Sequence, residues 1–342
     1  METFDFSVRD AAALEKFYAL PPQVYAHDPL WAPQSEAAVT ALLAGAGRIF
    51  VRPVLVEAGG QPLARAVAIL VPGAVDQHNH PLGYIGCFEC LQQHPQAGQA
   101  ALSRAEHILR AQGAASVQAP RVDNMLMGLV IGPEPLPQTV LTPHNPPYYA
   151  GILTGSGYTL REQLYTYIFD RSCAINLPFR SPGVRTRSFD RRNLAEEILI
   201  FHNLQQEIFK THPGWIERSL EEDRQMIEGF LPMLDDDLVI IAEERQGQPI
   251  GLLVCIPDVY QAFRGQIIDN ARLISIGALP FAAHKGIGVM MGLHLMRNLL
   301  QKGYQTLEAS WVRDSNVSPQ NLARRFKARP GRLLGLYEKR LG

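Results

Sequence analysis

One stretch in the second half of the chain decides the fold: Arg272-Leu-Ile-Ser-Ile-Gly-Ala-Leu-Pro-Phe-Ala-Ala-His-Lys-Gly-Ile-Gly-Val-Met-Met-Gly292. Its β-branched beginning predicts a strand that ends at Pro280, and the residues after Gly288 predict a helix. Between the two, glycines allow successive backbone N–H groups to turn toward one point, and the helix N-terminus adds partial positive charge. The stretch therefore predicts a phosphate-binding loop.

Two basic residues, His284 and Lys285, precede the glycines and add positive potential at the same place. The loop does not match the G-x-x-x-x-G-K-[ST] pattern of P-loop proteins. A dinucleotide-binding fold is an alternative, because Glu308 follows Gly288 at a spacing near that of a ribose-binding acid. Against it, Pro280 and further residues separate the glycines from the strand, and the preceding elements form a hairpin rather than a β-α-β unit.

Outward from the loop, each half of the chain has the same predicted order of elements, β-α-α-β-β-β-α-β-α-β. Each half contains two predicted helices, a hairpin with a glycine turn, a third strand, an amphipathic helix closed by glycine, and further strands. The turns of the hairpins are expected at Gly59-Gly60 and Gln246-Gly247. We expect domains at 1–172 and 184–342, joined by a linker rich in Pro, Ser and Arg at 173–183.

Composition narrows the class of protein. The 342 residues are 46% hydrophobic and 19% charged, which excludes a disordered, collagen-like or coiled-coil chain. The net charge of −1 gives no drive toward nucleic acid or an anionic membrane. That charge divides unequally, with 9 Lys+Arg against 14 Asp+Glu in residues 1–170 and 23 against 19 in residues 171–342. The basic half is the one that contains the glycine loop.

We expect a cytoplasmic protein that does not enter a membrane. No apolar run reaches the ~20 residues that a membrane span needs, and the N-terminus lacks the pattern of a signal peptide. Four cysteines make no disulfide framework. Cys87 and Cys90 have C-x-x-C spacing, but on a strand they point to opposite faces, so we expect no metal or redox site. We likewise expect no metal site at His78 and His80, two histidines of a predicted loop.

The second half resembles the GNAT superfamily of acyl-CoA-dependent N-acyltransferases. The order of elements matches, and 279–288 resembles the family's [Q/R]-x-x-G-x-[G/A] pyrophosphate loop. The segment from Asn316 through Asn321-Leu-Ala-Arg-Arg-Phe326 resembles the family's last helix. The first half has the same order without the loop. Over nearly its full length the chain resembles the tandem GNAT proteins, which implies an α/β fold of two mixed-sheet domains, the first a degenerate copy.

This resemblance implies acetyl-CoA or another acyl-CoA as co-substrate and a small amine as acceptor, with no nucleic acid or membrane partner and with oligomerisation possible. An amide of Ala278 or Leu279 would stabilise the developing oxyanion. The residues implied in acyl-CoA binding are Ala278, Leu279, His284, Lys285, Gly286, Ile287, Gly288, Val289 and Asn316. Two positions depart from the family pattern, because Ala283 replaces the usual Gln or Arg, and Phe326 stands where a proton-donating Tyr is usual.

The reaction needs a base, because an ammonium group is not a nucleophile. The candidates are Glu308, after the loop helix, and Asp258, after the hairpin, with Asp314 as a third. Tyr337 is a candidate proton donor. Each also has a purely structural interpretation, as a solvated, turn-forming or packed side chain. We therefore expect an N-acyltransferase, with a catalytically inactive acyl-CoA-binding module and an NAD(P)-dependent oxidoreductase as the alternatives.

Overall fold

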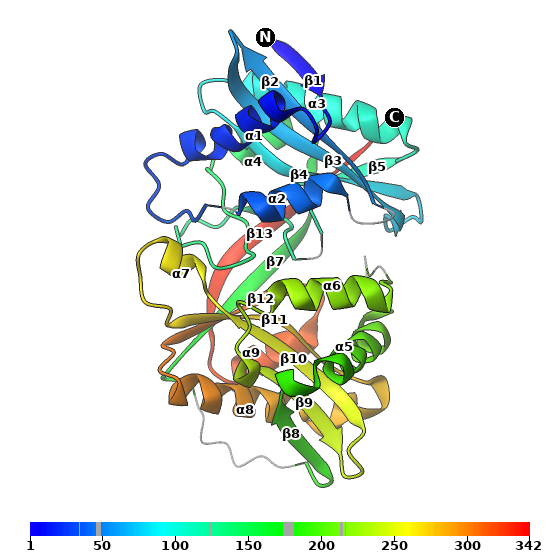
Figure 1. The fold of residues 1–342 in the computed structure, drawn as a ribbon, viewed down its shortest axis with the longest axis vertical. Coiled ribbons are helices and arrows are strands. Elements are labelled where there is room, and N and C mark those ends of the chain that lie inside the picture. Colours follow the sequence, from blue (N-terminus) through cyan, green and yellow to red (C-terminus); the bar gives the residue numbers. More distant parts are fainter. Residues whose placement is uncertain (34, 46–48, 124, 174–180, 213–214, 216) are drawn as a thin grey trace. The chain divides into compact units, whose positions relative to one another are not determined.

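The computed structural model describes residues 1–33, 35–45, 49–123, 125–173, 181–212, 215 and 217–342. The chain divides into two compact units. Unit 1 contains Met1–Leu164 together with Leu333–Gly342, and unit 2 contains Tyr165–Arg332. Figure 1 shows the elements of both.

Unit 1 is built on a sheet with the strand order β1-β2-β3-β4-β5-β13. Its strands are β1 (Glu2–Asp5), β2 (Phe50–Ala58), β3 (Gln61–Val75), β4 (Pro81–Cys90), β5 (Ser116–Ala119), β6 (Leu129–Val130) and the ends of β7 (Thr159–Asp170) and β13 (Arg329–Arg340) that belong to this unit. Its helices are α1 (Ala11–Val24), α2 (Glu36–Ala44), α3 (Pro95–Ala111) and α4 (Tyr149–Gly155). The main core packs α3 and α4 against the sheet.

Unit 2 has the strand order β7-β12-β11-β10-β9-β8. Its other strands are β8 (Val184–Ser188), β9 (Val239–Glu244), β10 (Pro249–Pro257), β11 (Asn270–Ala278) and β12 (Thr306–Arg313). Its helices are α5 (Leu194–Phe209), α6 (Leu220–Phe230), α7 (Tyr260–Phe263), α8 (Ile287–Gln301) and α9 (Val317–Arg325), with 3₁₀ turns η1 (Arg191–Asn193), η2 (Asp236–Leu238) and η3 (Pro280–Lys285). Strands β8 to β11 form an antiparallel run, and β11 and β12 are parallel.

Each unit is completed by the end of a strand that starts in the other. The last residues of β7 belong to unit 2, and the last residues of β13 belong to unit 1. There β13 pairs with β5, Tyr337 opposite Ala119 and Arg340 opposite Ser116. The first segment of unit 1 therefore ends at Leu164, and its second segment begins at Leu333. The sequence predicts instead a linker at 173–183, of which 174–180 lie outside the described residues.

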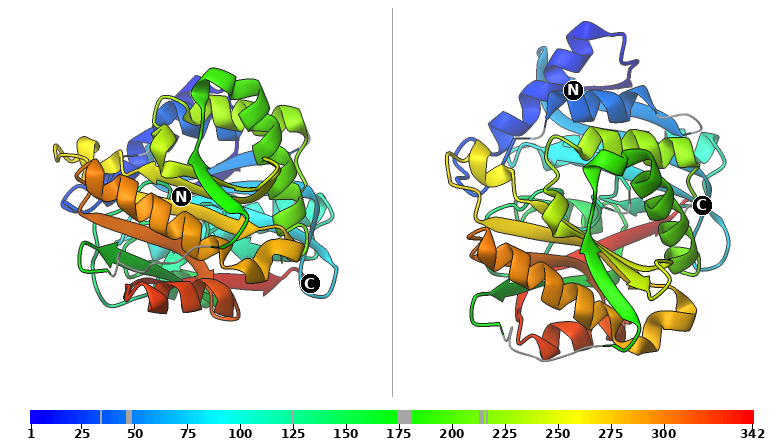
Figure 2. Two further views of the ribbon diagram at one scale, coloured as in Figure 1. Left: turned by 90° about the horizontal axis from the view of Figure 1, so that it is seen from below. Right: turned by 60° about the horizontal axis from the view of Figure 1, so that its bottom comes forward.

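Helices cover both faces of the sheet of unit 2. One face packs against α8, through a cluster that includes Leu253 and Leu273. The other face packs against α5, through a cluster that includes Ile241 and Leu252. Figure 2 shows α8 in orange and α5 and α6 in green on opposite sides of the yellow strands. The glycine loop lies at the start of α8, on the α8 face.

Several local predictions are confirmed. The side chain of Ser35 caps α2 by accepting from the Ala38 amide. Ser219 and Glu222 form the reciprocal capping box at the start of α6. Both hairpins turn where the glycines predict, β2–β3 at Gly59-Gly60 and β9–β10 at 245–248. The two-residue strand β6 and the one-turn helix α7 are too short to produce a periodic pattern, and the sequence does not predict them.

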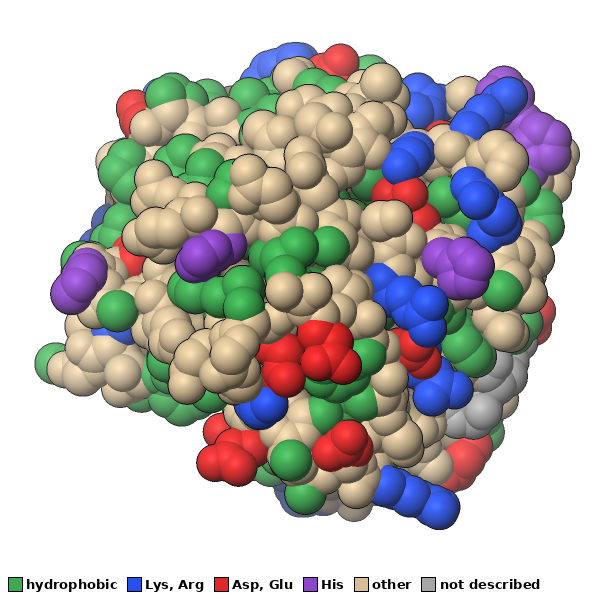
Figure 3. Space-filling view, turned by 90° about the horizontal axis from the view of Figure 1, so that it is seen from above, with side chains coloured by type: hydrophobic (Ala, Val, Ile, Leu, Met, Phe, Trp, Pro, Cys, Tyr) green, Lys and Arg blue, Asp and Glu red, His purple; other side chains and the backbone are tan. Residues whose placement is uncertain are grey.

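The face drawn in Figure 3 shows how charge is distributed over one side of the molecule. Lys and Arg side chains there alternate with Asp, Glu and His, and hydrophobic side chains form several separate groups. Charges of both signs so close together do not produce a uniform cationic field on this face. Within the described part of the chain, no helix is both long and apolar enough to cross a membrane.

One glycine of β11 fixes how closely α5 approaches the sheet. A Cβ at Gly277 would lie 2.3 Å from Cγ2 of Ile208 and 3.4 Å from the ring of Phe209. The first distance is well inside van der Waals contact, and the atom that it meets is a branch methyl rather than the end of a flexible chain. Gly277 is therefore a packing requirement of the α5 face.

We expect Gly277→Ala to destabilise the protein by roughly 1–3 kcal/mol, because a methyl group is forced into a packed interface. Chemical denaturation measures this change. The double variant Gly277→Ala/Ile208→Ala should cost less than the sum of the two single changes, because the second substitution removes the colliding methyl. Gly229→Ala on α6, where nothing lies within 4 Å, is the control and should be neutral or stabilising. Wild-type stability in Gly277→Ala would contradict the assignment.

Candidate functional site

The parallel strands β11 and β12 are paired only over their first residues. Their register runs from Asn270 opposite Thr306 to Leu273 opposite Ala309, although β11 continues to Ala278 and β12 to Arg313. The register of β11 with β10 shifts at the same level, so that Ile274 is an extra residue on β11. We call the space beyond Leu273 and Ala309 the opening. Along it, backbone groups of β11 are available to a ligand.

The hydrogen-bond pattern shows which amides of β11 face the opening. Leu279 donates its N–H to the carbonyl of Ile250 at 2.8 Å, so it is paired with β10. Residues of an antiparallel pair alternate in direction, so the amides of Ala278 and Ile276 point away from β10 and toward the opening. The sequence named Ala278 or Leu279 as oxyanion donor, and this geometry favours Ala278 and adds Ile276.

The glycine loop lies where β11 leads into α8. Gly286 has φ +70°, a left-handed conformation that requires glycine in practice. Gly288 has no such requirement, and a Cβ there would meet only Cδ1 of Ile276, at 3.8 Å. The first amides of a helix have no intrahelical partner. An open glycine beside them is the shape that a phosphate-containing ligand can approach closely, so these residues fit an acyl-CoA pyrophosphate.

Packing on the sheet holds this helix start in place. Ile287 is fully buried and lies over Gly251 of β10, where a Cβ would come within 2.9 Å of Cγ2 of Ile287. Val289 is also buried, in the same core cluster. The side chains of Ile287 and Val289 therefore anchor the loop in the core. Only the backbone of these two residues is left for the acyl-CoA that the sequence analysis expects there.

Charge near the loop comes from Lys285, which is exposed and lies 3.5 Å from Glu244 and over the ring of Phe281. The backbone of His284 is part of η3. Asn316 precedes α9 at the end of β12, and its side chain does not cap that helix. Because β11 and β12 are parallel, Asn316 and the glycine loop lie at the same edge of the sheet.

The proposed base Glu308 is buried rather than solvated. It is 3% exposed, and its two oxygens accept from Nε and Nη2 of Arg332 at 3.0 and 3.3 Å. Its register partner Arg272 is also buried and donates from Nε to Ser310. Both carboxylate oxygens of Glu308 are therefore engaged by one guanidinium group.

Asp258 has a similar environment. It is 1% exposed, its Oδ2 lies 3.7 Å from Nη2 of Arg264, and Asn270 donates to the same oxygen at 3.3 Å. Asp314, the third candidate, is exposed just after β12. Asp258 and Glu308 thus both belong to the buried polar part of unit 2, each with an arginine partner, and their role as a base stays a prediction.

Tyr337, the candidate proton donor, and Phe326, which stands where a proton-donating Tyr is usual, are both core residues. Tyr337 belongs to the core cluster of unit 1, whereas the glycine loop belongs to unit 2, and burial raises the pKa of Tyr337 above its usual value. Phe326 is 2% exposed and packs against Gly292 of α8, with its ring edge-on to Phe169 at 6.2 Å. Neither side chain is placed as a proton donor within unit 2.

In unit 1, α3 has the place in the order of elements that α8 has in unit 2, and its first turn is closely packed. At the start of α3, Pro95 has no N–H to offer, and a Cβ at Gly98 would lie 3.0 Å from Sγ of Cys90 and 3.1 Å from Ile152. Cys90 itself is buried and contacts the carbonyl of His94 at 3.2 Å. The side chains of Cys90 and Ile152 thus pack against the first turn of α3, whereas the Cβ position at Gly288 meets only Ile276.

The sequence did not single out the polar residues on the α5 face. Gln205 of α5 donates to Oγ of Ser275 on β11 at 3.3 Å, and His202 of α5 contacts Asp223 of α6 at 2.8 Å. Further along, burial and the charge of Arg313 lower the pKa of His212. The sequence pattern that could have identified them is a histidine and a glutamine three residues apart on one predicted helix. Such a pair alone is a weak indication of a site.

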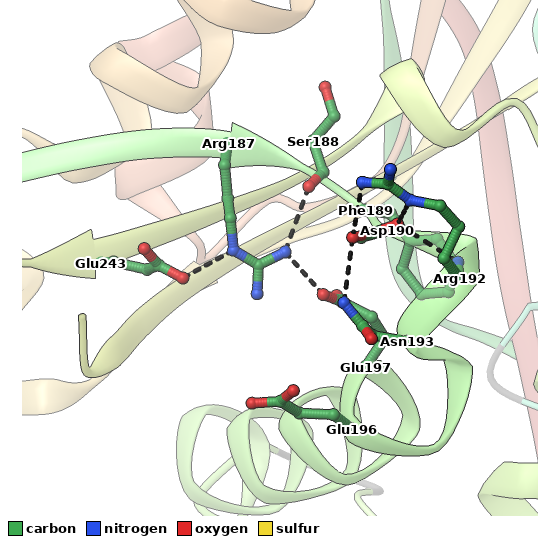
Figure 4. A pocket seen from close by; sticks show the side chains of 9 residues that line it. All are labelled: Arg187, Ser188, Phe189, Asp190, Arg192, Asn193, Glu196, Glu197 and Glu243. Carbon is green, nitrogen blue, oxygen red and sulfur yellow. Dashed lines mark hydrogen bonds and ion pairs between the residues drawn. The ribbon is translucent and has the colours of Figure 1, made fainter.

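Figure 4 shows an open pocket of about 470 Å³ where β8 leads into α5. Arg187 donates to Glu243 and Glu197, both at 2.6 Å, and Asp190 pairs with Arg192. Burial raises the pKa of Glu197 in spite of its arginine partner. The lining is therefore mostly satisfied by its own ion pairs, and the pocket lies at β8 and β9 rather than at the opening.

No protein-family model matches the chain. Protein YghO of Escherichia coli is 23% identical over 368 residues, covering 96% of this chain and 93% of that protein. The bacterial ceramide synthase of Caulobacter vibrioides is 23% identical over 381 residues, covering 98% and 96%.

Among solved structures, a tandem GNAT protein from the clavulanic acid biosynthesis pathway matches with a TM-score of 0.67 at 12% identity. That match covers 100% of this chain and 98% of the other. A GCN5-related N-acetyltransferase from Sphaerobacter thermophilus matches with a TM-score of 0.61 at 14% identity, covering 99% and 96%. A dinucleotide-binding unit is not found at the loop, because β10 runs antiparallel to β11 immediately before it. The chain has the tandem GNAT fold.

Proposed function

We propose that unit 2 binds an acyl-CoA at the glycine loop and the opening, and transfers its acyl group to an amine. The observation that carries this proposal is the open approach to Gly288 at the start of α8, next to inward-facing amides of β11. A pyrophosphate would accept from the first amides of α8, and the rest of the molecule would follow β11 into the opening.

The proposed binding residues divide by role. Gly286, Ile287, Gly288 and Val289 would bind phosphate through the backbone, and Lys285 and His284 would contribute positive charge. Ala278 would donate its amide to the acyl carbonyl, while Leu279 contributes by its paired position at the end of β11. Asn316 would contact the ligand from the neighbouring edge of the sheet.

Bound acyl-CoA supplies a thioester, whose carbonyl carbon is electrophilic. The chain's part is to hold that carbonyl against an amide of β11, which stabilises the charge that develops on its oxygen. It must also admit the amine from the opposite face and accept a proton from it. The amine would enter at the opening from the side of α5, since α8 and the loop occupy the other side.

For the acceptor, we propose an amine with a long hydrocarbon chain as the first class to test. The support is the likeness to the bacterial ceramide synthase, which extends over 98% of this chain. We further propose that unit 1 binds no acyl-CoA, because Pro95 and the packing of Gly98 against Cys90 close the corresponding place.

The competing proposal is a binding module without turnover. It is favoured by the arginine partners of Glu308 and Asp258 and by the buried Phe326. Calorimetry with acetyl-CoA and palmitoyl-CoA, followed by measurement of thiol release with sphinganine and short amines, separates the two. Binding with thiol release supports the transferase, and binding without release across both amine classes supports the module.

Gly288→Glu tests the loop directly. A carboxylate within about 4 Å of a phosphate costs about 4 kcal/mol at the effective dielectric of a protein surface. We therefore expect acyl-CoA to bind on the order of 1,000-fold more weakly. Gly151→Glu on α4, also a helical glycine with nothing within 4 Å, is the matched control and should bind as the wild type does. Unchanged affinity in Gly288→Glu, measured by calorimetry, would refute the loop assignment.

Lys285→Ala tests the electrostatic part. An exposed charge contributes roughly 0.2–1 kcal/mol, so we expect affinity for acyl-CoA to fall a few-fold. The loss should shrink as salt is raised, because the Debye length falls from ~30 Å at 0.01 M to ~3 Å at 1 M. Lys16→Ala, which removes an ion-paired lysine of unit 1, is the control. A loss of affinity that is the same at both salt concentrations would contradict a role through charge.

A further inference from the structure

A histidine on the α5 face is held by a fully buried carboxylate. Nδ1 of His202 lies 2.8 Å from Oδ2 of Asp223, a residue of α6 with no exposed surface. The other oxygen of Asp223 accepts from Nε of Arg218 at 2.6 Å. Both carboxylate oxygens are therefore bound, one by an imidazole and one by a permanent cation.

This arrangement fixes the state of the imidazole. Both oxygens of Asp223 accept hydrogen bonds, one from Arg218 and one from His202, as a carboxylate does. Nδ1 of His202 must then carry a proton and donate it, which leaves the lone pair of a neutral ring on Nε2. The side chain of His202 is 19% exposed, so Nε2 belongs to a group that a ligand can reach.

The same helix face lies on β11 beside the opening. Gln205 is three residues after His202, on the neighbouring turn, and donates to Oγ of Ser275 at 3.3 Å. Ser275 is next to Ile276, whose amide faces the opening. Seven residues after His202, Phe209 lies 3.4 Å from the position of a Cβ at Gly277. The contacts run in step along the two elements, Gln205 at Ser275 and Phe209 at Gly277, so His202, one turn before Gln205, lies near the level of Leu273, where the opening begins.

The carboxylates that the sequence nominated differ from His202 in one respect. The carboxylate of Glu308 is bound by Arg332, and that of Asp258 lies next to Arg264. In His202, by contrast, only Nδ1 is bound by Asp223, and Nε2 lies on the other side of the ring. A carboxylate behind an imidazole is the arrangement by which a histidine accepts a proton and holds the resulting charge.

We propose that His202, positioned by Asp223, accepts the proton of the substrate amine in the transfer reaction proposed above, on which this inference rests. Nε2 takes one proton from the substrate ammonium, and the charge of the imidazolium is balanced by Asp223. The free amine then forms a C–N bond to the acyl carbon as the C–S bond breaks. The second amine proton ends on the departing sulfur, and His202 releases its proton to solvent.

The test compares His202→Ala with wild type in thiol release from an acyl-CoA with an amine acceptor. Loss of a general base costs about 10²–10⁴-fold in rate, and we expect kcat to fall in this range while acyl-CoA affinity stays unchanged. Added free imidazole should restore part of kcat, which a merely structural link between α5 and α6 would not allow. Asp223→Asn should also lower kcat, without rescue by imidazole.

His107→Ala, which removes an exposed histidine of α3 in unit 1, is the control and should leave turnover unchanged. Thermal unfolding of each variant shows whether the fold is kept. Full turnover in a folded His202→Ala would overturn the role of His202 while leaving the transferase intact. A wild-type chain that binds acyl-CoA and releases no thiol with any amine would overturn the transfer step, and this proposal with it.

A second measurement does not depend on turnover. Diethyl pyrocarbonate modifies neutral imidazole nitrogens, and mass spectrometry maps the modified histidines. We expect His202 to react in the wild type and to be protected when acyl-CoA and a long-chain amine are both bound. A His202 that stays unmodified while His107 reacts would overturn the assignment of an accessible lone pair on Nε2.

Discussion

The candidate site depends on the point at which two parallel strands stop sharing hydrogen bonds. β11 and β12 are joined only as far as Leu273 and Ala309, and an extra residue on β11 accompanies the break. Buried backbone groups need partners, so the unpaired length of β11 is a strand edge that an extended ligand can complete. The loop, the amides of Ala278 and Ile276 and the two approaches to the sheet all follow from this break.

The two faces of the sheet in unit 2 carry different kinds of polar groups. On the α8 face, packing of Ile287 on Gly251 fixes a helix start whose backbone is its useful part. On the α5 face, charged and polar side chains are buried in pairs, such as Glu308 with Arg332 and His202 with Asp223. Buried pairs of this kind contribute little net stability, but removing one partner is costly, so they hold side chains in defined positions.

Much of the local structure could be predicted, because it depends on residues close in sequence. The glycine loop, both hairpins and the caps at Ser35 and Ser219 are of this kind. The burial and the hydrogen-bond partners of the site residues could not be predicted in this way. Whether Glu308 is solvated depends on Arg332, 24 residues away, and whether the Leu279 amide is available depends on Ile250. The pairing of His202 with Asp223 joins two helices, and periodicity identifies a helix without identifying its neighbour. The same limit applied to Tyr337, whose alternating pattern indicates a strand but not the sheet that the strand joins.

The exchange of strand ends has a consequence for the order of folding. Unit 1 is discontinuous in sequence, and its sheet needs residues 333–342, which are synthesised after the whole of unit 2. During synthesis, β5 stays an open edge while more than two hundred residues are added, an interval in which such an edge is exposed to aggregation.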